Sequence, residues 1–181
     1  MLKSVLPWWR YPVSVEGQFV EEFTMQGIAF QDAYPDDLSH CYGCGRNNER
    51  GHQLKSYWRG EQTIAHFTPE PFHTAIPGFV YGGLIASLID CHGTGSASAA
   101  AQRALELTGE HLDEPPRFVT AALNIDYLAP TPMGVELELV GEIIEVKPRK
   151  VVVVEITLSA EGKVCARGHM VAVRMPETMA L

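Results

Sequence analysis

The sequence predicts an α+β fold in which one antiparallel sheet packs against a single long helix. Three observations predict this class. A short hairpin comes first, a long run of apolar and small residues at helical spacing follows it, and four strand-like stretches complete the chain. Elements in this order are typical of two packed layers, a sheet with one central helix on it.

The hairpin is predicted at residues 54–67. Leu54 to Trp58 and Thr63 to Phe67 form two short strands, and Arg59-Gly60-Glu61-Gln62 connects them as a turn. The preceding segment, residues 41–52 (CYGCGRNNERGH), is rich in turn-forming residues.

One long helix is predicted from Gly82 to Leu107. Leu84, Ile85, Leu88, Ile89 and His92 recur at helical spacing, and residues 93–101 are mostly glycine, alanine and serine. Thr108-Gly109 follows, and a glycine commonly ends a helix. Because small residues let a helix lie close to a sheet, we expect this helix to be nearly enclosed.

Four strands are predicted after the helix, at Phe118–Leu128, Val135–Val146, Val151–Leu158 and Val164–Val173. Short turns such as Lys147-Pro148-Arg149 separate them, which favours an antiparallel meander. The first strand alternates, with one face expected to carry Val119, Ala121, Leu123, Ile125 and Tyr127. Nothing in the sequence protects the sheet edges, so edge pairing in a dimer is expected.

The chain of 181 residues is expected to contain an N-terminal extension, residues 1–40, and one domain, residues 41–181. An amphipathic helix is predicted in the extension between Val15 and Phe30, with a loop at Tyr34-Pro35-Asp36-Asp37 after it. No secretory leader is apparent in the first residues.

Composition narrows the class of function. A formal charge of −8 argues against nucleic acid as a main partner. No apolar run reaches the roughly 18 residues that a membrane span needs. With four cysteines and no secretion signal, a disulfide framework is not expected, and a reducing cytoplasmic setting is predicted.

Asp90 and the pair Gly82-Gly83 are the candidate catalytic groups. Asp90 lies in the most apolar part of the chain, where a carboxylate is costly to bury outside a site, although a place on a polar stripe of the helix is the alternative. The glycines open the helix, where free N–H groups and the helix dipole favour a developing oxyanion, although a simple tight turn would also explain them. Gly83 and Asp90 are two helical turns apart on one face, so both are predicted to flank one scissile bond.

The segment YGGLIASLID, residues 81–90, resembles the His-Gly-Gly…Asp motif of hot-dog-fold acyl-CoA thioesterases of the PaaI-like group. Residues 73–80, with His73 and Pro77-Gly78-Phe79-Val80, are similar to the same group, as is the CYGCG segment. TAALNIDYLAP, residues 120–130, is similar to the strand after the helix in human-type thioesterase superfamily members. The resemblance covers about residues 41–175.

This resemblance implies a role for several residues. Asp90 would be the nucleophile or the general base, Gly82 and Gly83 would polarise the carbonyl, and the Thr120 hydroxyl would hold the water or the carboxylate. It also implies a site shared between two protomers. Tyr81 stands where the family has histidine, so it could donate a hydrogen bond but could not transfer protons near neutral pH. His73 and His92 are possible substitutes.

The remaining candidates concern ligand and metal binding. The resemblance implies that the turn with Arg149 and Lys150 lies near the phosphates of coenzyme A, although an ordinary solvated turn is the alternative. His73 is a further candidate for substrate contact. Cys41 and Cys44, with His40 and His52 nearby, could supply the four ligands of a zinc site. Because no second Cys-x-x-Cys pair is present, no metal is expected, and no cofactor other than the coenzyme A of the substrate.

The predicted function is therefore an acyl-CoA thioesterase working as a homodimer or as a homotetramer built from two dimers. A hot-dog module that binds acyl-CoA without hydrolysing it is the alternative, because Tyr81 removes a usual catalytic partner. An enoyl-CoA hydratase is less consistent with the sequence, since the expected Asp…His pair is not found. A purely structural dimer is the remaining possibility.

Overall fold

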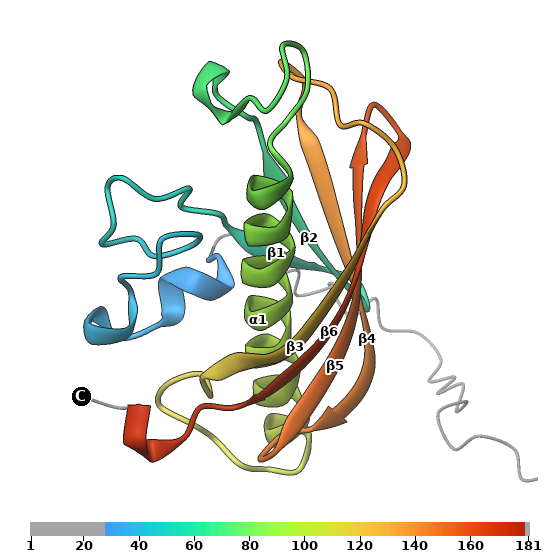
Figure 1. Ribbon diagram of the computed structural model, residues 1–181. Coiled ribbons are helices and arrows are strands. Elements are labelled where there is room, and N and C mark those ends of the chain that lie inside the picture. The colour runs from blue at the N-terminus through green and yellow to red at the C-terminus, as the bar shows by residue number, and fades with distance from the viewer. Residues whose placement is uncertain (1–27, 180–181) are drawn as a thin grey trace, which may run out of the picture.

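The computed structural model describes residues 28–179 and shows one long helix lying on a six-stranded antiparallel sheet (Figure 1). This arrangement confirms the predicted α+β class. The helix, α1, spans Gly82–Leu107. The strands are β1 Ser56–Arg59, β2 Gln62–Phe67, β3 Phe118–Tyr127, β4 Leu137–Lys147, β5 Val151–Ala160 and β6 Lys163–Arg174. Short 3-10 helices lie at Phe30–Ala33, Asp36–Leu38, Pro71–His73 and Glu177–Met179.

The strand order is β1-β2-β4-β5-β6-β3, so the predicted meander is correct only for β4, β5 and β6. Strand β3 pairs with β6 and not with β4, the strand that follows it in the chain. Residues 128–136, which include two prolines, join β3 to β4 and are too long for a tight hairpin. This connection carries the chain across the sheet and leaves β3 as one of its two edges.

Helix α1 is enclosed, as the small residues predicted. Every residue from Cys91 to Ala101 is buried except Thr94. The sheet covers one side of the helix, and the segment before β1 lies on the other side (Figure 1). A Cβ at Gly168 would lie 2.4 Å from Cγ2 of Ile89, so glycine on β6 lets the helix approach the sheet closely.

A chain of buried polar side chains joins the segment before β1 to the helix. His92 on α1 bonds through Nδ1 to Ser56 Oγ at 3.0 Å and through Nε2 to Thr63 Oγ1 at 3.2 Å. Ser56 also bonds to the Gln31 side chain, and Thr63 lies 2.6 Å from Ser96 Oγ. These groups are almost completely buried and find partners in one another, so the network fixes the helix against β1 and β2.

The predicted N-terminal helix lies mostly outside the described residues, which begin at Ile28. Ile28 and Ala29 are not helical, and Phe30 begins a 3-10 turn instead of ending an α-helix. No helix of residues 28–179 is long and apolar enough to span a bilayer.

Strand β3 does not keep the single alternating face that the sequence predicted. Its register against β6 shifts between Thr120 and Ala122, which makes Ala121 a bulge residue. Leu123 and Ile125 still contact the core, as predicted, but before the bulge Phe118 takes the core position in place of Val119. A bulge inserts one extra residue, so the inward-facing positions change from even to odd numbers at that point.

Candidate active site

Asp90 lies in the third turn of α1 and is half-buried. Its Oδ1 accepts a hydrogen bond from Thr120 Oγ1 on β3 at 2.5 Å. Burial raises the pKa of the Asp90 carboxyl, the bond from Thr120 opposes this shift, and a charge on Cys41 adds to it. The structure thus brings together two residues that the sequence assigned to one site from segments 30 positions apart.

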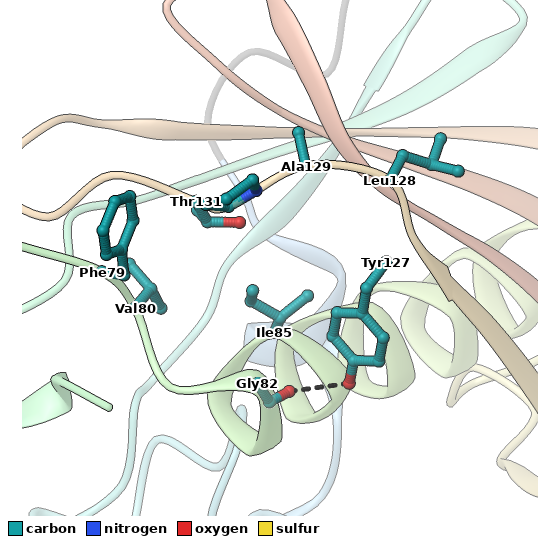
Figure 2. Close-up of a pocket in the computed structure, with 9 residues that line it drawn as sticks. Phe79, Val80, Gly82, Ile85, Tyr127, Leu128, Ala129 and Thr131 are labelled. Atoms are coloured by element: carbon teal, nitrogen blue, oxygen red, sulfur yellow. Dashed lines mark hydrogen bonds between the residues drawn. The ribbon is translucent and has the colours of Figure 1, made fainter. Parts of the chain in front are cut away.

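Gly82 and Gly83 form the first turn of α1, with Tyr81 as the N-cap residue. The first amides of a helix have no intrahelical partner, and within residues 28–179 the N–H groups of both glycines make no hydrogen bond. Together with the helix dipole they form a site for a partial negative charge. Tyr127 at the end of β3 fixes this turn by donating a hydrogen bond to the Gly82 carbonyl at 2.9 Å (Figure 2).

Tyr81 places its ring over the second glycine. A Cβ at Gly83 would lie 2.4 Å from the Tyr81 ring and 2.5 Å from its hydroxyl oxygen, so glycine is what makes room for the phenol. The Tyr81 side chain is otherwise open, with 58% of the residue exposed. The hydroxyl is therefore positioned beside the free amides, in a place where it could donate to a bound carbonyl oxygen.

Gly83 and Asp90 share a face of the helix but do not meet. Seven residues at a rise of 1.5 Å separate them by about 10 Å along the axis. A carbonyl group bound to the Gly83 amide is thus out of reach of the Asp90 carboxylate of the same chain. The expectation that both flank one bond holds only if the glycine turn comes from a second copy.

An apolar cavity of about 300 Å³ opens beside the glycine turn (Figure 2). Ile85 and Tyr127 line its helix side, and Ala129 and Thr131 lie across from them. The Thr131 hydroxyl is buried and has no partner in the described part of the chain. The full lining consists of Phe79, Val80, Gly82, Ile85, Tyr127, Leu128, Ala129, Pro130 and Thr131.

Neither histidine replaces the family's missing imidazole in this chain. His92 is completely buried in the polar network, where burial lowers its pKa to about 3. The His73 Nδ1 accepts the backbone N–H of Glu70 at 3.0 Å, and its ring lies among aromatic rings that include Phe67 and Phe72. Both side chains thus have structural partners, and neither contacts Asp90.

The structure does not bring Arg149 and Lys150 to the glycine turn. Both lie in the turn between β4 and β5, and Arg149 forms an ion pair with Glu110, just beyond the C-terminal end of α1. The glycines lie at the opposite end of this 26-residue helix. Any contact of these cations with a substrate held at the glycine turn of the same chain would have to bridge about 39 Å of helix.

The sequence does not indicate two residues near the candidate site, Tyr127 and Cys91, as site residues. For Tyr127 the sequence predicts only a place on an apolar face, because nothing local indicates that its hydroxyl reaches Gly82. For Cys91 the sequence predicts only a helix position, yet its sulfur lies with those of Cys41 and Cys44, all within 4.8 Å of one another. Neither His40 nor His52 belongs to that group, in contrast to the zinc site weighed from the sequence.

Comparison with known proteins identifies the family of the chain. The thioesterase superfamily matches residues 77–166. A crystal structure of a thioesterase superfamily protein from Shewanella loihica has 71% sequence identity, with 78% of this chain and 98% of that chain aligned and a TM-score of 0.59. The chain belongs to the thioesterase superfamily. The family resemblance drawn from the sequence is thereby confirmed.

Solved structures with lower sequence identity share the fold. Zebrafish thioesterase superfamily member 2 is 15% identical, covering 82% of this chain and 99% of its own, with a TM-score of 0.58. The E. coli PaaI protein from the phenylacetic acid degradation operon is also 15% identical, over 69% of this chain and 81% of its own, with a TM-score of 0.55. A Streptococcus mutans protein bound to acetyl CoA is 18% identical, over 67% and 88%, with a TM-score of 0.54. The comparison with curated proteins found no match.

Proposed function

We propose that this thioesterase superfamily protein hydrolyses acyl-CoA to a free acid and CoA at a site shared by two protomers. The observation that carries the proposal is the half-buried Asp90 carboxylate, held by Thr120 at 2.5 Å in the mostly apolar N-terminal part of helix α1. Superfamily membership supports thioester hydrolysis. The acetyl CoA bound to the Streptococcus mutans relative supports a CoA ester as the substrate class.

A homodimer, or a tetramer of two such dimers, would supply the second copy that the helix geometry requires. Strand β3 is a sheet edge, and its middle residues from Thr120 to Ala122 are exposed. Large apolar side chains are also exposed next to it, namely Phe79, Tyr81, Tyr127 and Leu128. An unpaired edge beside an apolar patch favours association with another sheet. Pairing of two such edges would let Asp90 of one chain approach the partner's helix start.

The chemistry assigns one role to each part. The thioester carbonyl oxygen would accept hydrogen bonds from the glycine amides, which stabilise the oxyanion of the tetrahedral intermediate. Asp90 would either take a proton from the attacking water or attack the carbonyl carbon itself and form an anhydride that water then cleaves. In both routes the C–S bond breaks, the CoA thiolate leaves and takes up a proton, and one water molecule is consumed per thioester hydrolysed.

The substrate's remaining contacts are proposals from the resemblance. Arg149 and Lys150 are proposed for the phosphates of CoA, which requires Arg149 to give up its ion pair with Glu110. His73 is proposed as a substrate contact; its backbone carbonyl accepts the N–H of Tyr81 at 2.8 Å. We expect the enzyme to act in the cytoplasm, because its four cysteines are free and suit a reducing compartment.

Turnover of a panel of acyl-CoA thioesters tests the proposal. The rate of CoA release by the wild-type protein is compared with that of Asp90→Asn, which removes the carboxylate at almost constant size. Asp113→Asn is the matched control, because Asp113 is exposed and remote in sequence from the helix start. The proposal predicts loss of turnover only in Asp90→Asn. Equal rates in all three proteins would refute it.

A non-hydrolytic acyl-CoA-binding module is the second candidate. Tyr81 favours it, because a phenol stands over Gly83 where the family has an imidazole. Such a module would bind acyl-CoA at 1:1 stoichiometry in calorimetry and would release no CoA over hours. Binding with turnover that depends on Asp90 would exclude this candidate.

A further inference from the structure

Three cysteine side chains from two distant segments converge beside the third turn of helix α1. Cys41 and Cys44 lie in the turn before β1, and Cys91 lies on α1 directly after Asp90. Their sulfur atoms are within 4.8 Å of one another, and Cys41 Sγ lies 3.7 Å from Cys91 Sγ. Cys44 and Cys91 are buried, whereas Cys41 is exposed at the mouth of the cluster.

Two glycines make this convergence possible. A Cβ at Gly43 would lie 2.2 Å from the sulfur of Cys91, so the turn can rest on the helix only with glycine at that position. A Cβ at Gly45 would lie 2.5 Å from two backbone atoms, and the Gly45 N–H closes the turn on the Cys41 carbonyl at 2.8 Å. The position of the thiols is therefore built into the backbone.

The three sulfurs have few partners other than one another. Cys41 Sγ contacts Cys91 Sγ, and no lysine or arginine in residues 28–179 forms a hydrogen bond to any of the three sulfurs. Three cysteine sulfurs this close together are a donor set that thiophilic metals prefer.

We propose that Cys41, Cys44 and Cys91 bind a thiophilic divalent cation such as Zn²⁺, with the fourth position open to solvent beside Cys41. Tetrahedral zinc with Zn–S bonds of about 2.3 Å has sulfur atoms about 3.8 Å apart, which is the spacing that Cys41 and Cys91 already have. The remaining sulfur pairs need to close by at most about 1 Å. Binding would form three S–metal bonds and release a proton from each protonated thiol.

The thiols lie next to the candidate active site but are not groups that the proposed hydrolysis uses. The reaction uses Asp90 and a glycine turn, whereas the thiols come from the turn before β1 and from Cys91, the helix residue after Asp90. The test of the proposed metal site therefore measures metal binding and not turnover, so that either proposal can fail alone.

The full-length protein, reduced and stripped of metal with a chelator under anaerobic conditions, is titrated with Co²⁺. The proposal predicts one Co²⁺ per chain, with sulfur-to-cobalt charge-transfer absorption and the visible bands of a tetrahedral site, both removed by added Zn²⁺. Cys41→Ser changes an exposed side chain and should weaken binding by about 10–100-fold or more. Cys44→Ser should do the same, with circular dichroism as its folding check.

Cys165→Ser is the matched control, because Cys165 is also buried and free but lies on β6, away from the cluster. It should leave the titration unchanged. The absence of charge-transfer absorption in the wild-type protein would overturn the proposal. So would equal Co²⁺ affinity in Cys41→Ser and the wild type, or a mass two hydrogens lower in the protein as purified, which would indicate a disulfide within the cluster.

Discussion

Thr120 and Tyr127 are seven positions apart on strand β3, yet both donate side-chain hydrogen bonds to helix α1, to Asp90 Oδ1 and to the Gly82 carbonyl. In a regular strand, residues separated by an odd number point to opposite faces of the sheet. The bulge at Ala121 adds the residue that brings both to the helix face. One backbone irregularity thus supports both the candidate carboxylate and the candidate oxyanion turn.

Deleting Ala121 should therefore destabilise the protein. Without the bulge, Leu123, Ile125 and Tyr127 would turn away from the helix. Exposing the partly buried Leu123 and Ile125 side chains would cost about 1.5–3 kcal/mol. Urea unfolding measures the change in the free energy of unfolding. Ala121→Ser keeps the residue count and should change it by less than about 0.5 kcal/mol, because Ala121 is exposed. Similar free energies of unfolding for the two variants would show that the bulge does not determine which β3 side chains point toward helix α1.

Thr120→Val should lower kcat with little change in KM. The valine keeps the shape but removes the donor to Asp90, and a hydrogen bond to a charged group is worth about 1.5–3 kcal/mol, or roughly 10–100-fold in rate. Thr120→Ser should restore most of kcat, which a merely structural role would not require. Steady-state kinetics on one acyl-CoA measures both constants. A Thr120→Val variant with wild-type kcat would contradict a positioning role.

Substitutions of Tyr81 test whether the phenol acts on the carbonyl. Tyr81→Phe keeps the ring over Gly83 but removes the hydroxyl, and we expect kcat/KM to fall by about tenfold, the value of one neutral hydrogen bond. Tyr81→His restores the family residue and should raise kcat near neutral pH. Because Tyr81 is mostly exposed, the melting temperature should stay constant and serves as the control. Unchanged kinetics in Tyr81→Phe would remove the hydroxyl from the mechanism.

His92 should make the protein sensitive to acid. Its pKa in the folded state is about 3, below its ordinary value of 6.5, so between these pH values the unfolded chain binds a proton that the folded chain does not. The free energy of unfolding should fall by about 1.4 kcal/mol per pH unit from this residue as the pH drops below 6.5. His92→Gln, which keeps hydrogen-bonding capacity toward Ser56 and Thr63, should show a shallower decline in urea unfolding. If the free energies of unfolding of the wild type and His92→Gln fall in parallel with pH, His92 is not the cause of the acid sensitivity.

The elements of the fold were predictable because their signals are local. Apolar spacing from Leu84 to His92 and the glycine after Thr108 mark the helix, and short turns such as the one at Gly162 mark the strands. The neighbour of β3 was not predictable in the same way. Pairing with β6 depends on contacts between residues 39 to 56 positions apart, and the bulge at Ala121 has no distinctive local sequence.

The residues of the candidate site also differ in whether a local sequence signal indicates them. Asp90 stood out because its helical neighbours are apolar, and Gly82-Gly83 stood out as a helix start. Tyr127 did not, because an aromatic residue on an alternating strand is ordinarily a packing residue. The proximity of Cys91 to Cys41 is visible only in the folded structure, because 50 positions separate them in the chain.

A hybrid dimer tests most directly that one protomer's carboxylate works with its partner's glycine turn. Two variants, Asp90→Asn and Gly82→Pro, are co-expressed with different tags, and the mixed species is isolated through both. Proline is tolerated at the first helical position, where it removes the free Gly82 amide, and a Cβ there would meet Tyr127 only at 3.6 Å. Each parent should be inactive, and the hybrid, which holds one intact shared site of two, should show about half the wild-type kcat. A hybrid as inactive as its parents, or a wild-type protein that remains a monomer in solution, would contradict the shared site.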